Sequence, residues 1–210
     1  MRNKLARPRQ TSGFTLVELL VVISILASLI GIMMPALNGV RESMWATRSL
    51  ARVSELATGV EAYRREYNYY PGQKDWATTA TWSNGSLKLA EALFDPDGNG
   101  TFEAKFAPLN EGDLLTINGG GIWDRFHEDY PAAVCYYPAK PGENTLAQFD
   151  VGHNTNHTKA IAGFDDYIRD TRFDGSGTTP RPYNAGKFLL IAPGKDRVYC
   201  TADDNRNFGN

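Results

Sequence analysis

The side chain with the clearest chemistry in this sequence is Glu18, because it is the only ionisable group in a long apolar stretch. This stretch covers residues 14–37, which is close to the ~20 residues that a helix needs to cross a bilayer. A carboxylate inside such a span is costly, so it calls for a partner. If the chain is cut between Gly13 and Phe14, Phe14 gains an α-amino group, and we expect Glu18 to pair with that amine on a neighbouring parallel helix.

A second group of polar side chains could bind a metal ion. Asp95, Asp97 and Asn99 occupy positions 1, 3 and 5 of an EF-hand-like calcium loop, and Gly100 occupies position 6. Position 12, where a bidentate acid is needed, is Phe106. The segment is therefore either a calcium loop that takes a further ligand from elsewhere or an Asx-rich turn.

Arrangements typical of catalysis are not evident in the sequence. His153 and His157 are four residues apart, but their segment has neither a helical pattern nor the adjacent Glu of a zinc protease motif. No Gly-x-Ser-x-Gly, phosphate-binding loop or dinucleotide fingerprint occurs. We therefore expect that the protein is not an enzyme.

One long helix is expected to position Glu18. After the apolar stretch, residues 38–70 change to an amphipathic pattern in which apolar residues recur every three or four positions. Pro35 is tolerated where neighbouring helices satisfy the backbone in a membrane, and Pro71 with Gly72 should end the helix. We predict a nearly continuous helix over residues 14–69, whose amphipathic stripe packs on the rest of the protein. The stripe consists of Val40, Met44, Leu50, Val53, Leu56 or Ala57, Val60, Tyr63 and Tyr67.

The remaining residues, 71–210, are rich in Gly and Pro. This composition predicts a head with many loops. Residues 132–137 and 187–192 have the composition of strands, residues 198–200 are a candidate third strand, and residues 86–94 predict a short helix. The fold class is therefore expected to be α+β, with the long helix packed on a small antiparallel sheet. Residues 141–182 are long and polar, and we expect them to form a surface excursion.

Residues 1–13 form a basic leader with four Lys or Arg residues and no acid. Such residues stay in the cytoplasm, so the head should lie on the far side of the membrane. Removal of the leader makes the formal charge more negative than the −2 of the full chain. No basic stripe remains outside the membrane, and we expect no binding to nucleic acid.

The segment Gly13-Phe-Thr-Leu-Val-Glu18, after a short basic leader, resembles the type III signal of type IV pilins and type II secretion pseudopilins. In that family a prepilin peptidase cuts after the glycine and methylates the new N-terminal residue, here Phe14. Glu18 falls on the family's fifth mature position and Pro35 on its twenty-second, which implies a role for both in assembly. An ordinary signal peptide or anchor is the alternative, but it lacks an Ala-x-Ala cleavage site and leaves Glu18 unexplained.

Residues 192–208 resemble the end of type II secretion major pseudopilins, where a Ser-x-Gly-x-Asp-Gly turn precedes Gly-Thr-x-Asp-Asp-Ile-x-Asn. In that family the loop binds calcium, so the resemblance implies a structural calcium ion held by Asp196 with Asp203 or Asp204. A solvated acidic tail is the alternative. The matching residues are Gly194, Asp196, Thr201, Asp203, Asp204 and Asn207, and the departures are Ala192 for Ser, Arg197 and Cys200 for Gly, and Asn205 for Ile.

The two cysteines, Cys135 and Cys200, both lie in predicted strands of the exported part. Export permits a disulfide, which would stabilise the head by a few kcal/mol. A pair of buried thiols is the alternative, and the sequence leaves both open.

Taken together, the resemblance implies a structural subunit of a helical pseudopilus, most like the major pseudopilin of a type II secretion system. Its expected partners are further copies of itself, prepilin peptidase, an inner-membrane platform with a cytoplasmic ATPase, and minor pseudopilins. The expected location is the inner membrane, with one span and a periplasmic head. The alternatives are a type IV pilin for adhesion, motility or DNA uptake, and a membrane-anchored calcium-binding or ligand-binding protein that forms no fibres.

Overall fold

The computed structural model describes residues 13–77, 83–99, 101–103, 105–115, 119–126, 131–157, 161, 163–175 and 177–209. Most of the basic leader and Gly100 of the EF-hand-like segment lie outside these residues. The chain divides into two compact units, Met1–Glu42 and Ser43–Asn210.

Helix α1 (Leu16–Tyr67) is 52 residues long, which confirms the predicted long helix to within two residues at each end. Pro35 lies inside it. The residue after the helix, Asn68, has a φ of 62°, a left-handed conformation that Asn adopts more readily than most residues and that commonly ends helices. The chain therefore turns just before Pro71.

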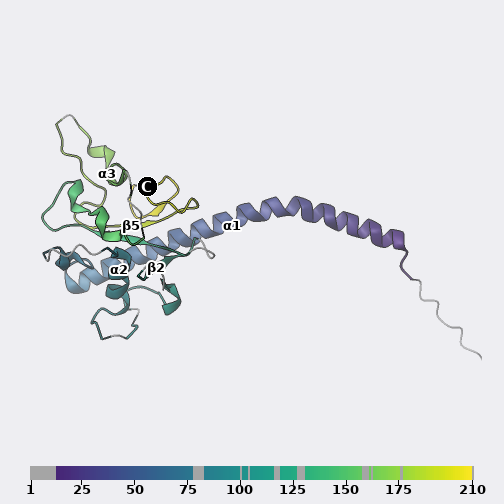
Figure 1. Cartoon of the computed structure of the whole chain (residues 1–210), viewed down its shortest axis with the longest axis horizontal. Helices are drawn as coiled ribbons and strands as arrows, with labels where there is room; N and C mark the ends of the chain where they lie inside the picture. Colours follow the sequence, from purple (N-terminus) through teal and green to yellow (C-terminus); the bar gives the residue numbers. More distant parts are fainter. Residues whose placement is uncertain are drawn as a thin grey trace, which may run out of the picture. The chain divides into compact units, whose positions relative to one another are not determined.

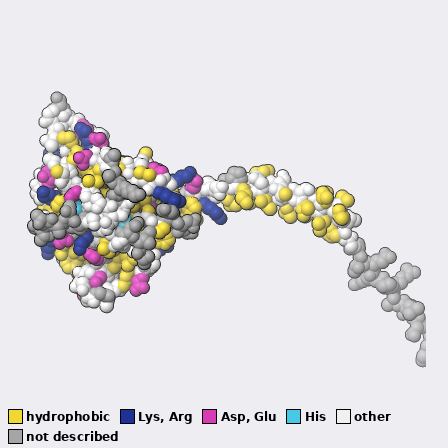
Figure 2. Space-filling model, viewed as in Figure 1, with side chains coloured by type: hydrophobic (Ala, Val, Ile, Leu, Met, Phe, Trp, Pro, Cys, Tyr) yellow, Lys and Arg dark blue, Asp and Glu magenta, His cyan; other side chains and the backbone are white. Residues whose placement is uncertain are grey.

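The first half of α1 is apolar and exposed, as its yellow side chains in Figure 2 show. An 18-residue window of the helix has a mean hydropathy of 2.7, and none of that window is buried. By length and composition the helix can therefore cross a membrane.

The second unit contains two short helices and two three-stranded antiparallel sheets, which confirms the α+β class (Figure 1). The order in each sheet is β1-β2-β3 and β4-β5-β6. The elements are α2 (Gly85–Phe94), β1 (Leu114–Leu115), β2 (Gly121–Asp124), β3 (Ala132–Ala133), β4 (Cys135–Pro138), α3 (Phe164–Ile168), β5 (Phe188–Ala192) and β6 (Asn205–Arg206). Within the described residues, short 3₁₀ helices lie between them, namely η1 (Gln73–Ala77), η2 (Glu111–Asp113), η3 (Leu146–Gln148), η4 (Val151–Asn154) and η5 (Thr171–Phe173).

The predicted strand 187–192 and the helix 86–94 are confirmed. The predicted strand 132–137 is instead two short strands, β3 and β4, which belong to different sheets. The candidate strand 198–200, expected in the sheet that contains β5, is wrong. The third strand of that sheet is β6, whose residue Asn205 pairs with Ala192. The physical reason is local, because Arg197 and Cys200 have φ values of 62° and 66°. Left-handed residues at both positions prevent an extended strand there.

Strand β5 separates two hydrophobic cores by its alternating side chains. Phe188, Leu190 and Ala192 belong to the core that contains α1 and α2, whereas Leu189 and Ile191 belong to the core on the other face. The first core draws Val53, Leu56, Val60 and Tyr63 from α1. These residues confirm part of the predicted stripe, but Val40, Met44 and Leu50 are 65%, 43% and 48% exposed, so the stripe is not buried along its whole length.

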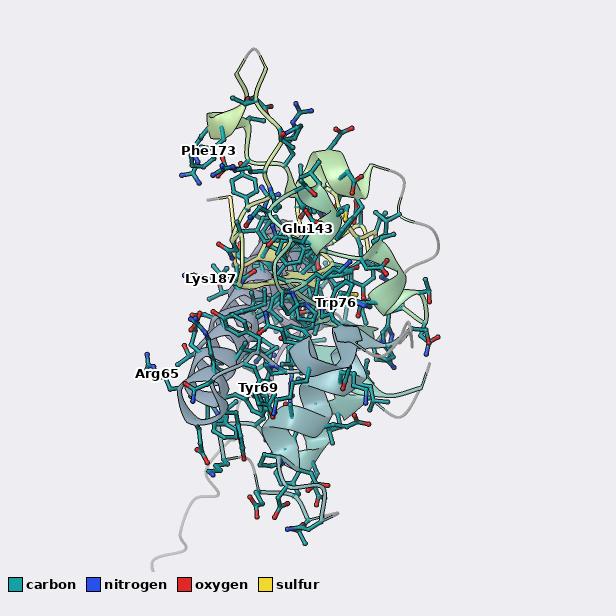
Figure 3. All side chains as sticks on the ribbon, turned by 90° about the vertical axis from the view of Figure 1, so that its left-hand side faces the viewer. Arg65, Tyr69, Trp76, Glu143, Phe173 and Lys187 are labelled. Carbon is teal, nitrogen blue, oxygen red and sulfur yellow. The ribbon has the colours of Figure 1, made fainter. Side chains whose placement is uncertain are left out.

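The segment 141–182 is not simply a surface excursion. Its residues Phe149, Phe164 and Ile168 are buried in the second core, against Tyr137 of β4 and Leu189 of β5. In Figures 1 and 3 this segment, with α3, lies on the opposite side of the head from α2. The segment therefore covers the second face of the β4–β5 pair, which a polar composition did not predict.

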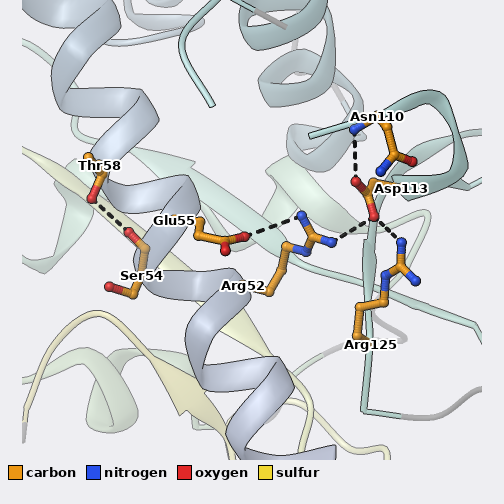
Figure 4. Close-up of polar contacts among 7 residues, drawn as sticks. All are labelled: Arg52, Ser54, Glu55, Thr58, Asn110, Asp113 and Arg125. Carbon is orange, nitrogen blue, oxygen red and sulfur yellow. Dashed lines mark hydrogen bonds and ion pairs between the residues drawn. The ribbon is translucent and has the colours of Figure 1, made fainter. Parts of the chain in front are cut away.

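A buried charge cluster ties α1 to the β1–β2 region (Figure 4). Arg52 of α1 donates a hydrogen bond to Oδ1 of Asp113 at 2.6 Å, and Arg125 donates to the same oxygen. The backbone amide of Asn110 donates to the other oxygen at 2.9 Å. Burial by itself raises the pKa of Asp113, but the hydrogen bonds from Arg125 and Asn110 and the charge of Arg52 bring it below its usual value.

A second buried carboxylate belongs to Asp124 in β2. The residue is 1% exposed, and neither carboxylate oxygen has a hydrogen-bond partner among the described residues. Burial raises the pKa of Asp124 to about 7, and the nearby polar groups of Ser49 and Phe126 and the charge of Arg52 offset only part of this effect. Asp113 and Asp124 therefore have opposite electrostatic environments.

Candidate assembly and metal sites

The carboxylate of Glu18 forms a capping box with Thr15 at the start of α1. The backbone amide and the hydroxyl of Thr15 donate to Oε2 of Glu18 at 2.9 and 2.8 Å. In return, the amide of Glu18 donates to the hydroxyl of Thr15 at 3.2 Å. This reciprocal arrangement satisfies amides that a helix N-terminus leaves unpaired. Glu18 is thereby held at the end of the helix beside Phe14, whose side chain is 78% exposed.

Thr15 is a functional residue that the sequence analysis missed. The signal was present, since Thr-x-x-Glu before an apolar run is the pattern of a capping box. Glu18 was predicted only as the partner of an amine, whereas its carboxylate also accepts hydrogen bonds from Thr15 at the start of its own helix.

The structure brings together the three acids predicted at the C-terminus. Asp196, Asp203 and Asp204 each place one carboxylate oxygen within 4.8 Å of the others. Asp196 and Asp203 are exposed and Asp204 is half-buried. Several carboxylate oxygens at such spacing form the kind of donor set that the hard cation Ca²⁺ prefers, so the residues fit the predicted ion.

Hydrogen bonds hold two of these acids in place. Oδ2 of Asp204 accepts from the hydroxyl of Tyr167 at 2.9 Å and from the amide of Cys200 at 2.7 Å, and burial raises the pKa of Asp204. Burial also acts on Asp203, but the hydroxyl of Thr201 and the amide of Asp196 lower its pKa overall. Tyr167 comes from α3, far away in sequence, and no local pattern could have revealed it.

The backbone of this C-terminal loop has a conformation typical of glycine at two positions where the chain has other residues. Arg197 and Cys200 stand where the pseudopilin pattern has Gly, and both have left-handed φ values. Such values are normal for Gly and cost about 1 kcal/mol for most other residues. At Gly194, a Cβ would overlap the backbone oxygen and the carboxylate of Asp203. The backbone conformation at Arg197 and Cys200 therefore agrees with the pseudopilin pattern, although the residue types at these positions differ from it.

The EF-hand-like segment is stabilised as a set of Asx turns. The backbone amide of Asn99 donates to Asp95 at 2.9 Å, and the side-chain amide of Asn99 donates to Asp97 at 2.7 Å. Within the described part of the chain, Asp95 and Asp97 do not join a third acidic, histidine or cysteine side chain closely enough to share a metal ion. Calcium binding there stays a prediction, and Gly100 lies outside the described residues.

Comparison with known proteins identifies the N-terminal segment. Residues 8–34 match a family model described as the prokaryotic N-terminal methylation motif. The chain is 28% identical over 116 residues to the type IV wide pilus major component PilA4 of Thermus thermophilus, which covers 55% of this chain and 80% of that protein. The prepilin-type methylation motif and this weak similarity to a type IV pilin together support the type IV pilin and pseudopilin family. None of the solved structures matches the chain.

The methylation motif of this pilin family includes the residues predicted for processing and assembly. Gly13, Phe14 and Glu18 all lie within the matched residues 8–34. Pro35 lies one residue beyond the match, inside α1. The comparisons thus support the family, while the roles of the individual residues stay predictions.

Cys135 and Cys200 lie near the same core. Cys135 is buried in the core on the second face of the β4–β5 pair, and Cys200 packs against that core. Both are free thiols in the structure. Burial raises the pKa of the Cys200 thiol to about 12 and that of Cys135 further still. These surroundings keep the thiols protonated and slow to react, and the disulfide between them stays a prediction.

His153 and His157 both pack against or bond to other side chains of the head. His153 is 2% exposed and its ring meets that of Trp76 edge to face with 4.5 Å between centroids. Burial lowers the pKa of His153 to about 4, so the ring is neutral at pH 7. The ring of His157 forms a hydrogen bond with the side chain of Asn84, at the start of α2, at 2.9 Å.

A cavity of about 500 Å³ lies just beyond the end of α1. Tyr69 and Trp76, labelled in Figure 3, contribute its aromatic surface. The ammonium group of Lys74 lies 3.9 Å from the centre of the Tyr69 ring. Lys74 therefore already contacts one of these rings.

Proposed function

We propose that this chain is a structural subunit of the pseudopilus of a type II secretion system, not a catalytic protein. The methylation motif supports a subunit that prepilin peptidase cleaves after Gly13 and methylates at Phe14. The observation that carries the secretion branch is the C-terminal loop, where Asp196, Asp203 and Asp204 come together on a backbone with left-handed residues at the two Gly positions of the pseudopilin pattern.

In this proposal the apolar halves of many α1 helices leave the inner membrane and bundle at the axis of a fibre. Glu18 of one subunit pairs with the Phe14 amine of the next, while the head faces the periplasm. Head-to-tail contacts that do not close into a ring produce a filament. A membrane platform, a cytoplasmic ATPase and minor pseudopilins would drive assembly, and the growing fibre would move folded proteins outward.

A type IV pilin is the second candidate. The 28% identity to the pilus component of Thermus thermophilus favours it, because that protein is named as part of a type IV wide pilus. Deletion of the gene distinguishes the two branches. Loss of secreted proteins from the medium with unchanged surface pili would support the pseudopilin, and loss of pili with normal secretion would support the pilin.

The processing step is tested by the intact mass of the chain extracted from membranes. We expect the mass to correspond to loss of residues 1–13 and addition of one methyl group. The same chain from cells without prepilin peptidase should keep its full mass. An uncleaved chain in cells with active peptidase would contradict the fibre-subunit proposal and leave a membrane-anchored head.

We also propose that Asp196, Asp203 and Asp204 bind a structural calcium ion. When bound, the ion would neutralise three clustered carboxylates and order the C-terminal loop. At a free calcium concentration of about 100 times Kd, binding to the folded state alone contributes about 2.7 kcal/mol. For a chain of this size we expect Tm to rise by roughly 5–10 °C.

Thermal unfolding of the full chain in detergent, with calcium or with a chelator, tests this site. The Asp203→Asn variant should lose the calcium-dependent rise in Tm. Asp165→Asn, which alters an exposed acid of α3, should keep it. An equal rise in all three chains would place calcium elsewhere, and no rise in the wild type would contradict the proposal.

A further inference from the structure

A groove of about 250 Å³ lies between α2 and the β1–β2 pair. Its rim is acidic, because Glu91 and Asp95 also line it. Lys88 pairs with Glu91 at 3.0 Å, but both side chains are largely exposed, so this ion pair is weak. The apolar part of the groove consists of Leu87, Ala90, Phe94, Phe102, Leu114 and Leu115.

A segment of α1 beyond the apolar stretch has the complementary character. At 100° per residue, its side chains at positions 37, 40, 41, 44 and 48 fall within about 100° of arc on the helix. Leu37, Val40 and Met44 are 51%, 65% and 43% exposed, and Arg41 and Arg48 are exposed as well. Figure 2 shows dark-blue Lys and Arg side chains following the yellow apolar stretch along the helix. We call these five residues the apolar-basic face.

We propose that the apolar-basic face of one copy of this chain packs into the groove of a second copy in the fibre. Val40 and Met44 contact the apolar walls, and Arg41 and Arg48 pair with the acidic rim. This inference rests on the fibre function proposed above and names a contact between its subunits.

The composition of both surfaces favours contact between two copies over exposure of both surfaces to water. Exposed apolar groups that gather on one face commonly mark an interaction site. Interfaces typically have an apolar centre and a polar rim and are enriched in Met and Arg, which describes the two surfaces joined. The contact is heterologous, since the face and the groove are different parts of the chain, and such contacts repeat into open filaments.

The contact also gives a role to the acidic segment after α2. Its hydrogen bonds through Asn99 hold Asp95 and Asp97 in a defined turn. A fixed acidic rim loses less conformational freedom when an Arg pairs with it than a mobile one. In this contact, Asp95 and Asp97, which match part of a calcium loop, bind Arg of the second copy instead of a metal ion.

Charge reversal tests the contact in cells that produce fibres from the full chain. Arg41→Glu and Glu91→Arg, made singly, should each lower the amount of sheared fibre about tenfold, because like charges then face each other. The double variant restores the opposite charges and should return fibre to within about twofold of wild type. Asp165→Arg, on the exposed surface of α3, is the matched control and should assemble normally.

Crosslinking gives a second readout that does not depend on the loss of assembly. In fibres of the Met44→Cys, Thr101→Cys double variant, an oxidant should produce a ladder of covalent oligomers, since Thr101 lines the groove. Each single variant should give no ladder. Met44→Cys combined with Ser54→Cys, which lies on a different surface of α1, should give none either.

The outcomes separate this inference from the proposed function. If the wild type is processed but forms no fibres, the function itself is wrong. If the wild type forms fibres while Arg41→Glu assembles normally and the cysteine pair gives no ladder, the groove contact is wrong. Single variants that fail, a double variant that recovers and a ladder confined to the groove pair would establish it.

Discussion

Replacement of Glu18 by Leu is expected to abolish fibre assembly and to leave membrane insertion intact. Insertion should persist because Leu extends the apolar stretch of α1 and removes its one charge. Assembly should fail because the α-amino group of Phe14 on the neighbouring subunit then enters an apolar bundle without its carboxylate. Removing one partner of a buried charge pair costs about 3–5 kcal/mol, and the loss recurs at every subunit. The amounts of chain in the membrane fraction and in the sheared fibre fraction measure both effects.

The capping box allows a control that separates the charge of Glu18 from its hydrogen bonds to Thr15. Gln at position 18 can still accept the hydrogen bonds of Thr15, since Glu and Gln both serve in a capping box, but it carries no charge. We therefore expect Glu18→Gln to assemble as poorly as Glu18→Leu. Thr15→Val removes the hydroxyl and keeps the carboxylate, so it should retain more fibre than either. Normal fibres from Glu18→Leu would contradict the proposed pairing with Phe14.

Replacement of Asp113 by Asn is expected to lower the free energy of unfolding of the head by about 3–5 kcal/mol. The carboxylate of Asp113 is buried and accepts from both Arg52 and Arg125. Without its charge, the largely buried guanidinium of Arg52 loses its partner inside the fold. The pKa of Asp113 lies below its usual value, so its contribution is fully present at neutral pH and is lost as pH falls through that lowered pKa. Denaturant unfolding of the full chain in detergent at pH 8 gives the change.

Asp124 provides the matched control, with the opposite expected sign. Its pKa is raised by burial from 3.8 to about 7, so ionisation on going from pH 4 to pH 8 costs stability. Asp124→Asn should be more stable than wild type by roughly 2–4 kcal/mol at pH 8, and the difference should shrink toward pH 4. If Asp113→Asn and Asp124→Asn changed stability in the same direction at pH 8, the assigned electrostatic environments would be wrong.

The elements that the sequence predicted well depend on local patterns. The apolar stretch, the helical spacing through Tyr63 and the turn before Pro71 are sufficient to predict α1. Strand β5 is a continuous apolar run, and such runs between Gly and Pro are typical of buried strands. The Asp-rich end was located by its resemblance to pseudopilins. The structure then brought Asp196, Asp203 and Asp204 within reach of a single ion.

Strands β1, β3 and β6 have two residues each, too few to show a period, so only pairing with a neighbour defines them. The partners Arg52 and Asp113 are 61 residues apart, and Tyr167 and Asp204 are 37 apart. Such contacts depend on how the chain closes over long loops, which no local pattern encodes.

The long helix and the processing motif were predictable from the sequence, because they reside in residues close together along the chain. Which part of the amphipathic stripe is buried, and which part around Val40 and Met44 stays exposed, depends on the tertiary structure. The tertiary structure also decided that Arg197 and Cys200 adopt the backbone of glycine. The reason is physical, since burial and strained backbone angles are set by the whole packed fold and not by the residue that shows them.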